Sequence, residues 1–438
     1  MVVSSSSPTS ITSIPTTSII SISTATSTAT SPATTTAAAT TAAATTAATT
    51  TTAAATASIQ FTRPMQSIDY PQLSLICRDL LPSTTTLTNT TPDSSSTNLA
   101  TLSLENTLLN ESLCGYLSAI LASNHTLTRL SLSYCHLNDA MCGMLSSAMA
   151  INDDCAIHTI DWSGNSITSL GISSLAKMLN HNRSITCLNL SGGSNVVSVQ
   201  ACQALATALT TNVTLTKLQF CCNSIRDDVC QALAKLLTPI NTTTTFRASN
   251  AQNNLTLSCA CIAELDLHNL PEHVTPHNAN AISDAGVSFL CDALVLNPIL
   301  ETLNLAYNWL TPQACVGLGR VLSKNTALKY LDISHNQIAD HGCSLLCQEL
   351  MNNRVLEFLG LSANSIEDTG TQVMLDMLCV NQTLRTIEFV GNFFGLDTLE
   401  AMSSLLESNH TLTHLTITPP ARGSALEASI ARTLQRNR

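Results

Sequence analysis

The stretch from Asn325 to Asn353, NTALKYLDISHNQIADHGCSLLCQELMNN, decides the fold of this chain. Its first half alternates apolar and polar residues at Leu331, Asp332 and Ile333, which predicts a short strand with one buried face. Its second half predicts a helix with one apolar side, because apolar residues recur at the helical spacing, at Cys343, Leu346, Cys347 and Leu350. The unit is therefore one strand followed by one helix.

The same unit recurs along the chain at a fixed interval. The clearest copies fit L-x-x-L-x-L-x-x-N-x-L, with Ile or Phe at some Leu positions, and begin 28 residues apart at Leu300, Leu328, Leu356 and Leu384. Looser copies bring the count to eleven and begin at Leu99, Leu127, Ile157, Ile185, Leu215, Ile262 and Leu412. We expect the Asn column to hydrogen-bond backbone groups exposed where each strand turns inward, at Asn308, Asn336, Asn364 and Asn392.

Units of this kind must stack into an arc. A helix is about 10 Å wide and paired strands lie about 4.8 Å apart, so parallel strands should line the concave face and helices the convex face. We expect Asp side chains to cap the starts of their own helices, at Asp284, Asp340 and Asp368. We expect Asn near the helix ends to adopt the left-handed conformation, at Asn325, Asn381 and Asn409. Residues 424–435 predict a capping helix.

The unit resembles the repeats of a known family. The segment from Asn325 to Asn353 is similar to the leucine-rich repeats of ribonuclease inhibitor, of the C-terminal region of NOD-like receptors and of Ran GTPase-activating protein. The resemblance spans about 340 residues, from Leu99 onward. It implies an α/β leucine-rich-repeat solenoid of the ribonuclease-inhibitor type, shaped as a horseshoe. It does not select a function, because one scaffold serves many partners.

The N-terminal part of the chain has a different composition. Residues 1–65 are rich in Ser, Thr and Ala and have no charged residue before Arg63, so we predict a disordered tail. Residues 66–98 are predicted to be a linker with a possible N-terminal capping element, because QSIDYPQLSLICRDLLP at 66–82 contains several apolar residues. The repeat domain then occupies 99–438, with insertions near 239–260 and 269–279.

Charge and hydropathy exclude several classes of protein. The formal net charge is -11, so a basic nucleic-acid-binding surface is not expected. The N-terminus lacks the basic start and compact apolar core of a signal peptide, and no apolar run approaches the roughly 18 residues that span a bilayer. A transit peptide stays open as an alternative, although the first 62 residues contain no Arg. We expect a cytoplasmic protein without a membrane partner.

The 17 cysteines follow the repeat and not a disulfide framework. Six of them share one position on the inward face of the helix: Cys114, Cys142, Cys202, Cys230, Cys315 and Cys343. Neighbouring helices pack about 8–10 Å apart, which exceeds the roughly 7 Å limit for a disulfide, so we predict separate buried thiols and a reducing compartment. The resemblance to ribonuclease inhibitor, which relies on reduced cysteines, also implies the cytosol.

A further group of cysteines and histidines allows two interpretations. Thiolate and imidazole are zinc ligands, so a metal site could form from Cys259, Cys261, His268, His273 and His277. The alternative is a solvated loop whose His side chains never converge. We favour the loop, and therefore expect no metal and no other cofactor.

No enzyme motif accompanies the repeats. The sequence lacks G-x-x-x-x-G-K-[ST], H-E-x-x-H and G-x-S-x-G, so we expect neither catalytic residues nor a bound nucleotide. Binding is then the default, and the residue between the two buried positions of each strand should face the concave side. This central column is Ser131, Asp161, Asn189, Gln219, Asp266, Asn304, Asp332, Gly360, Glu388 and Thr416.

Acidic and aromatic side chains on this face are the candidate contacts for a partner. Exposed aromatic residues are scarce in a chain with 3% aromatic content, and such residues often dominate protein interfaces. The candidates are Asp161, Asp266, Asn304, Tyr307, Tyr330, Asp332, Phe358 and Glu388. The alternative is that these are ordinary solvated strand positions. Trp309 is expected to pack into the turn.

Two functions are compatible with the sequence. The first is a non-catalytic protein-interaction scaffold or regulator, whose acidic concave strip receives a protein partner with a basic surface. The second, implied by the resemblance, is a GTPase-activating protein similar to the Ran regulator, whose repeats need no catalytic motif of their own. The acidic C-terminal tail usual in that family is missing, because Ala431 to Arg438 carry three arginines.

Overall fold

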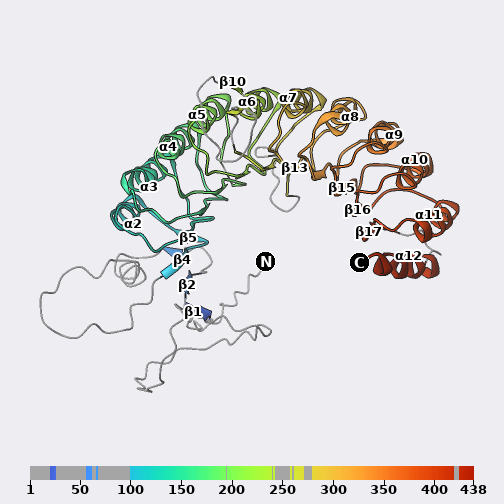
Figure 1. Cartoon of the computed structure of the whole chain (residues 1–438). Coiled ribbons are helices and arrows are strands. Elements are labelled where there is room, and N and C mark those ends of the chain that lie inside the picture. The colour runs from blue at the N-terminus through green and yellow to red at the C-terminus, as the bar shows by residue number, and fades with distance from the viewer. Residues whose placement is uncertain are drawn as a thin grey trace, which may run out of the picture.

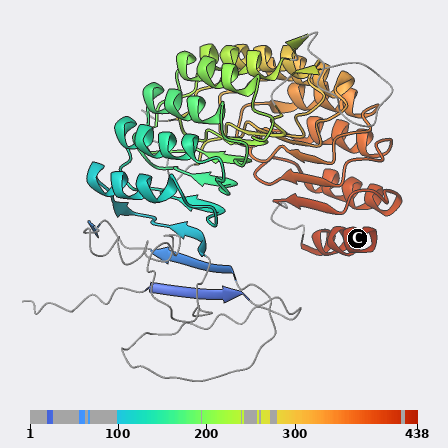
Figure 2. The same cartoon turned by 60° about the vertical axis from the view of Figure 1, so that its left-hand side comes forward.

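The computed structural model describes residues 99–193, 195–238, 240–241, 257–258, 261–270, 279–418 and 424–438, together with strand segments at 20–25, 56–61 and 66–67. Strands and helices alternate, and the strands line the inner side of an arc whose outer layer is formed by the helices (Figure 1). The turned view in Figure 2 shows the same two layers from the N-terminal strands to the last helix. The fold is an α/β leucine-rich-repeat solenoid, as the repeat predicted.

The inner layer is one continuous sheet. Eleven strands within the described residues, one from each repeat, pair in parallel and in chain order, which confirms the expected count. They are β4 (Leu99–Ser103), β6 (Arg129–Ser131), β7 (Thr159–Asp161), β8 (Cys187–Asn189), β9 (Lys217–Gln219), β12 (Glu264–Asp266), β13 (Thr302–Asn304), β14 (Tyr330–Asp332), β15 (Phe358–Gly360), β16 (Thr386–Phe389) and β17 (His414–Ile417). The insertion near 239–260 contributes an antiparallel pair, β10 (Ile240–Asn241) with β11 (Leu257–Ser258).

The outer layer consists of helices that follow each strand. In the described part of the chain they are α2 (Glu111–Leu121), α3 (Asp139–Ile151), α4 (Ser169–Leu179), α5 (Val199–Leu209), α6 (Asp227–Leu237), α7 (Asp284–Leu294), α8 (Ala314–Lys324), α9 (Ala339–Leu350), α10 (Asp368–Leu378), α11 (Leu396–Ser408) and α12 (Ser424–Asn437). Each packs its apolar side against the sheet, because one helical face carries Leu, Cys and Ala.

Two strands precede the first repeat. β2 (Thr56–Phe61) pairs in parallel with β4, and β1 (Ile20–Ala25) pairs antiparallel with β2. β2 satisfies backbone groups at the outer edge of β4, and the rest of the tail predicted to be disordered at 1–65 lies outside the described residues. β3 (Gln66–Ser67) pairs with β5 (Thr107–Leu108). The rest of the expected capping segment 66–98 lies outside the described residues.

The core lies between the two layers. The middle leucines of successive strands, such as Leu303, Leu331 and Leu359, are fully buried. The six cysteines of the shared helical position are buried free thiols, as expected for a stack of separate thiols. Burial raises the pKa of Cys142 and Cys202 to about 12, so both remain protonated at neutral pH.

The Asn column at the strand ends joins neighbouring repeats, as predicted. Asn336 Oδ1 accepts from the backbone N–H of Leu310 in the preceding repeat at 3.0 Å. Its Nδ2 donates to the carbonyl oxygens of Leu305 at 3.2 Å and Ile333 at 2.9 Å. One side-chain amide therefore satisfies buried backbone donors and acceptors of two coils at once.

The Asn residues at the helix ends have a different role from the one predicted. Asn325 and Asn409 are not left-handed, since their backbones are extended with φ of −74° and −82°. Asn325 Oδ1 accepts from Leu328 N–H at 2.8 Å, and its Nδ2 donates to the Asn297 carbonyl of the preceding repeat at 2.8 Å. These residues form a second ladder between coils, whose described C-terminal members are Asn297, Asn325, Asn353, Asn381 and Asn409.

The Asp residues at the helix starts also act between repeats. Asp284 is the first residue of α7 and does not cap it; that helix is capped by Ser283. Its carboxylate instead accepts from the backbone N–H of Thr311 at 2.8 Å and from the Thr311 hydroxyl at 2.6 Å. Asp340 and Asp368 likewise accept from the next repeat. Each Asp therefore fixes the start of the following helix, and the expectation of own-helix capping was wrong.

The last helix ends this second ladder. Asn437 lies 28 positions after Asn409, and its Nδ2 donates to the Asn409 carbonyl at 2.9 Å and the Leu412 carbonyl at 2.8 Å. Ile430 and Leu434 of α12 are buried against the last repeat. The helix thus supplies both the apolar cover and the amide that a further repeat would have provided.

Removing one ladder amide should destabilise the protein strongly. We expect Asn336→Ala to lower the free energy of unfolding by about 2–4 kcal/mol, because it leaves buried N–H and C=O groups without partners at about 1–3 kcal/mol each. Denaturant unfolding followed by circular dichroism measures the change. The neighbouring exposed residue provides the control: Gln337→Ala should change stability by less than about 0.5 kcal/mol. Equal effects of the two changes would contradict this role.

The Asp contacts should make stability depend on acid pH. The Gly395 backbone N–H and the Thr398 hydroxyl lower the pKa of Asp368 below its ordinary value of 3.8. A carboxyl with a lowered pKa in the folded state stabilises the fold above the ordinary value, and this contribution disappears as the pH falls through the folded pKa. Asp368→Asn should therefore melt earlier than the wild type at neutral pH and match it well below pH 3.8. A difference that persists in acid would contradict the charge-based explanation.

Candidate functional site

The central column faces the concave side in the register that the sequence predicted. Its members lie side by side on neighbouring strands, from Asp161 beside Asn189 to Glu388 beside Thr416. They alternate with the fully buried leucines, because successive side chains of a strand point to opposite faces. The register places Asp266, Asn304 and Asp332 on three consecutive strands. The strip of polar side chains therefore follows the arc.

A groove of about 610 Å³ lies where these strands end. Four of the eight predicted contact residues line it, namely Asn304, Tyr307, Asp332 and Glu388. His268 lies in the same lining, as do His335 and Thr416. The structure therefore brings half of the predicted residues into one hollow.

The two carboxylates of the groove have unequal surroundings. Asp332 is only 9% exposed, and its Oδ1 accepts from the Ser334 backbone N–H at 2.9 Å. Its side chain lies over Gly360, where an added Cβ would overlap Asp332 Oδ1 and lie 2.9 Å from Ser334 Oγ. Burial and the charge of Asp332 raise the pKa of Glu388 above its ordinary value. Negative charge is thus crowded at this point of the groove.

The predicted aromatic residues form two separate stacks. The rings of Tyr330 and Phe358 lie parallel with centroids 3.9 Å apart, because the register makes them direct neighbours on β14 and β15. The ring of Tyr307 stacks on His335 at 3.8 Å, beyond the strand ends, where both backbones are left-handed. Burial lowers the pKa of His335, and the charge of Asp332 opposes this shift. The first stack flanks the groove and the second lines it.

The remaining two predicted residues lie elsewhere. Asp161 borders a smaller hollow of about 110 Å³ near β4 and β6, together with Arg129 and Glu105. Asp266 Oδ1 lies 2.5 Å from His268 Nδ1. Burial opposes ionisation of Asp266, but the hydrogen bonds and charge of His268 outweigh burial and lower the pKa. The predicted set is therefore distributed over the concave face: most of it lies in or beside the groove, and Asp161 lies apart near the first strands.

Trp309 contradicts its predicted position. Its side chain is 62% exposed and does not pack into the turn. Asn308 points inward and donates to the Leu305 carbonyl, and Leu310 is buried in the core. The residue between them therefore points outward. Phe393 occupies the same repeat position and is 65% exposed. The N-x-L pattern itself was the signal that could have identified both.

The histidine and cysteine group is also rearranged. Cys259, His273 and His277 lie outside the described residues. His268 comes together with Cys221 and Asp266, a combination that the sequence reading missed, and Cys261 is not part of this group. Cys221 precedes His268 by 47 residues, so the pairing could be found only by aligning the repeats on each side of the insertion.

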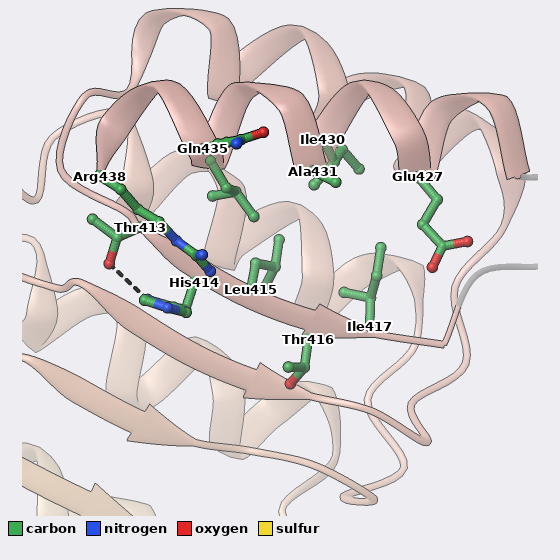
Figure 3. Close-up of a pocket in the computed structure, with 11 residues that line it drawn as sticks. Thr413, His414, Leu415, Thr416, Ile417, Glu427, Ile430, Ala431, Gln435 and Arg438 are labelled. Carbon is green, nitrogen blue, oxygen red and sulfur yellow. Dashed lines mark hydrogen bonds between the residues drawn. The ribbon is translucent and has the colours of Figure 1, made fainter. Parts of the chain in front are cut away.

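A further hollow, of about 630 Å³, lies between β17 and α12 (Figure 3). Leu415 and Ile417 point from the strand toward the helix, which presents Ile430 and Ala431 (Figure 3). Thr413 Oγ1 and His414 Nδ1 lie 2.9 Å apart. None of the predicted contact residues lines this hollow, so it belongs to the C-terminal cap and not to the candidate site.

Comparison with known proteins supports the repeat class. A scan against protein families matches the Leucine Rich repeat family at residues 123–140 and 324–347. A search of curated proteins finds no match. Together with the parallel strands and alternating helices, the family match identifies leucine-rich repeats in this chain.

Several solved structures are similar to parts of the fold. The actin-binding site 2 domain of leiomodin-1 is 21% identical with a TM-score of 0.31, covering 34% of this chain and 86% of that chain. The tropomodulin C-terminal domain of Caenorhabditis elegans is 14% identical with a TM-score of 0.31, covering 34% and 92%. An internalin of Listeria monocytogenes is 18% identical with a TM-score of 0.41, covering 78% of each chain.

Among the described residues, no helix has both the length and the apolar character needed to cross a bilayer.

The packing of Asp332 over Gly360 can be tested directly. Gly360→Ala should displace the Asp332 carboxylate and lower the free energy of unfolding by about 1–3 kcal/mol, the usual cost of overpacking. Gly115→Ala is the matched control, because a Cβ there meets nothing within 4 Å and favours the helix. Thermal unfolding of both variants gives the comparison. An equal or higher melting temperature for Gly360→Ala would show that this contact does not hold Asp332.

Proposed function

We propose that this chain is a non-catalytic protein-interaction scaffold of the ribonuclease-inhibitor type, which binds a basic segment of a protein partner in the concave groove. The observation that carries the proposal is the crowding of Asp332 and Glu388 in the groove. Within the described residues, neither carboxylate has a Lys or Arg within ion-pair distance. Two carboxylates in one groove, separated by the strand of Gly360, repel each other without a cation, and a partner's Lys or Arg would relieve that repulsion.

The aromatic stacks suit the same partner. A planar guanidinium can lie on an aromatic face while it hydrogen-bonds a nearby carboxylate. Tyr330 and Phe358 offer such a face two residues before Asp332 and Gly360, on the same side of the strands. A partner segment that carries Arg would therefore meet charge and stacking together.

Other parts of the proposal rest on the repeats. The ribonuclease-inhibitor type is supported by the 28-residue spacing and by a full helix after each short strand, such as α8 after β13. A cytoplasmic location is supported by the buried free thiols, which require a reducing compartment. A non-catalytic role is supported by the raised pKa of buried cysteines such as Cys142 and Cys202, because a thiol that stays protonated is a poor nucleophile.

Affinity purification with an isosteric double variant tests the site. We expect the full chain to capture proteins from a cell extract, and the variant Asp332→Asn with Glu388→Gln to lose those that dock through basic segments. Asp292→Asn is the control, since Asp292 is exposed on α7 and pairs with Arg320. Capture of the same proteins in the same amounts by all three forms would contradict the groove as the binding site. GTP hydrolysis by small GTPases, measured alongside, should not accelerate; acceleration would support the GTPase-activating alternative.

The crowded carboxylates should also cost stability in the free protein. Because the pKa of Glu388 is raised in the folded state, the fold loses stability as the pH rises through that value. Glu388→Gln should therefore melt at a higher temperature than the wild type at neutral pH, and the difference should vanish well below pH 4.5, the ordinary value for Glu.

A second Glu provides the control for this change. Glu301→Gln removes an ion pair with Lys329 and should not raise the melting temperature. A more stable Glu388→Gln that also binds its partner less well would link the stability cost to function. A less stable Glu388→Gln at neutral pH would contradict the charge crowding.

A further inference from the structure

Three side chains with metal-binding atoms meet at one end of the groove. Cys221 Sγ, an Asp266 carboxylate oxygen and His268 Nδ1 lie within 4.8 Å of one another. Their meeting follows from the register, because Leu218 of β9 pairs with Leu265 of β12. Cys221 and His268 each lie three residues after that pair, so they are neighbours across the long insertion.

The contacts converge on a single nitrogen. His268 Nδ1 lies 2.5 Å from Asp266 Oδ1, 3.2 Å from Cys221 Sγ and 3.3 Å from Asn304 Nδ2. A ring nitrogen has one in-plane position, which either carries a proton or accepts one. If Nδ1 carries a proton, it donates to the Asp266 carboxylate, and it then cannot accept from the Asn304 amide. Three potential partners therefore share one ring nitrogen.

The arrangement does not fit a nucleophilic cysteine. A Cys-His-Asp triad places the thiol on one ring nitrogen and the carboxylate on the other, whereas here both lie at Nδ1. Burial and the nearby charge of Asp266 raise the pKa of the Cys221 thiol, so it is not activated as a thiolate. The same proximity of a thiol and a carboxylate becomes favourable once a cation lies between them.

We propose that Cys221, Asp266 and His268 bind a divalent cation of the zinc class. Zinc takes sulfur, imidazole and carboxylate ligands at about 2.0–2.3 Å, which sets tetrahedral ligand atoms about 3.4 Å apart. The 3.2 Å between Cys221 Sγ and His268 Nδ1 is close to that spacing, whereas Asp266 Oδ1, at 2.5 Å from His268 Nδ1, would have to move away by about 1 Å to coordinate the ion. Three protein ligands leave a fourth position, and His268 lines the groove, so this position lies at the groove's end.

Neighbouring groups hold the carboxylate in place. Gln219 Nε2 donates to Asp266 Oδ2 at 3.4 Å, and the His268 backbone N–H donates to Asp266 Oδ1 at 3.4 Å. The site itself is shielded, since Cys221 is 3% exposed and the side chains of Asp266 and His268 are 19% and 18% exposed. Oriented ligands with limited access to water are typical of metal sites in proteins. The bound ion would also link the repeats on the two sides of the insertion.

The test uses the full chain, reduced and stripped of metal with a chelator. Titration with Zn²⁺ should show binding of a single ion, and Co²⁺ should give the near-ultraviolet absorption band of a cobalt-thiolate bond. Zn²⁺ should raise the melting temperature, because an ion that binds only the folded state stabilises it. Cys221→Ser should abolish the cobalt band, and His268→Gln and Asp266→Asn should weaken zinc binding at least about tenfold.

Cys222→Ser is the matched control, because Cys222 is the adjacent cysteine and its sulfur accepts from the Leu270 backbone N–H, as a serine hydroxyl can. It should retain the cobalt band and the affinity for zinc. Circular dichroism shows whether each variant is folded, and the near-isosteric Asp266→Asn decides the matter if Cys221→Ser does not fold. The proposal is overturned if the wild type binds no zinc, or if Asp266→Asn and Cys222→Ser bind it as tightly as the wild type. Partner capture does not enter this test, so it can fail independently of the proposed function.

Discussion

The structure depends on side-chain amides that hydrogen-bond backbone groups between neighbouring repeats, the coils of the solenoid. Each turn from strand to helix and from helix to strand leaves buried N–H and C=O groups without backbone partners. Each group that stays unpaired costs about 1–3 kcal/mol. Asn carries a donor and an acceptor at the end of a short side chain, so Asn336 and Asn325 can each bond two coils at once. Neither Asp, which lacks a donor when ionised, nor Ala could replace them.

This constraint also fixes the concave face. Since ladder amides such as those of Asn336 and Asn325 bond the coil before them, consecutive coils stack in one register along the arc. The register then decides which side chains meet: Tyr330 with Phe358, and Cys221 with His268. The candidate site is thus produced by stacking of the repeats, and a shift of one residue in any coil would turn its polar side chain into the core.

Much of this could be predicted from the sequence, and the reasons for the misses are physical. Spacing alone predicted the eleven strands, the buried leucines and the central column, because periodicity reports which face of an element is buried. It did not predict what the polar ladder residues bond. Asp284 and Asn325 have the residue types of helix caps, but their partners lie one repeat away, and local rules for caps consider only neighbours in sequence. The prediction for Trp309 was wrong because its large apolar side chain is exposed, although its size favours burial.

The sequence predicted several residues that line the groove, but it did not predict which side chains would lie together. Sequence placed Asn304, Asp332 and Glu388 on one face, and they line one groove. Cys221 could not be joined to His268 without knowing that β9 pairs directly with β12 across the insertion. The metal hypothesis from the sequence used cysteines and histidines that are close together along the chain. In the structure, Cys221, Asp266 and His268 lie together because their repeats are adjacent in the stack.

The distribution of charge changes along the concave face, and the groove lies where charge is not compensated within the sheet. In the column beside the central one, Lys217 forms an ion pair with Glu264 at 2.7 Å, so charge there is compensated within the sheet. From β13 to β16 the same column is uncharged, with Thr302, Tyr330, Phe358 and Thr386. The carboxylates of the central column therefore lie beside aromatic rings and hydroxyl groups there, and none of these four described residues carries an ammonium group. A repeat architecture can tolerate this, because each coil is stabilised by its own leucines and ladder amides, and the unfavourable charge of one surface column does not disturb the stack.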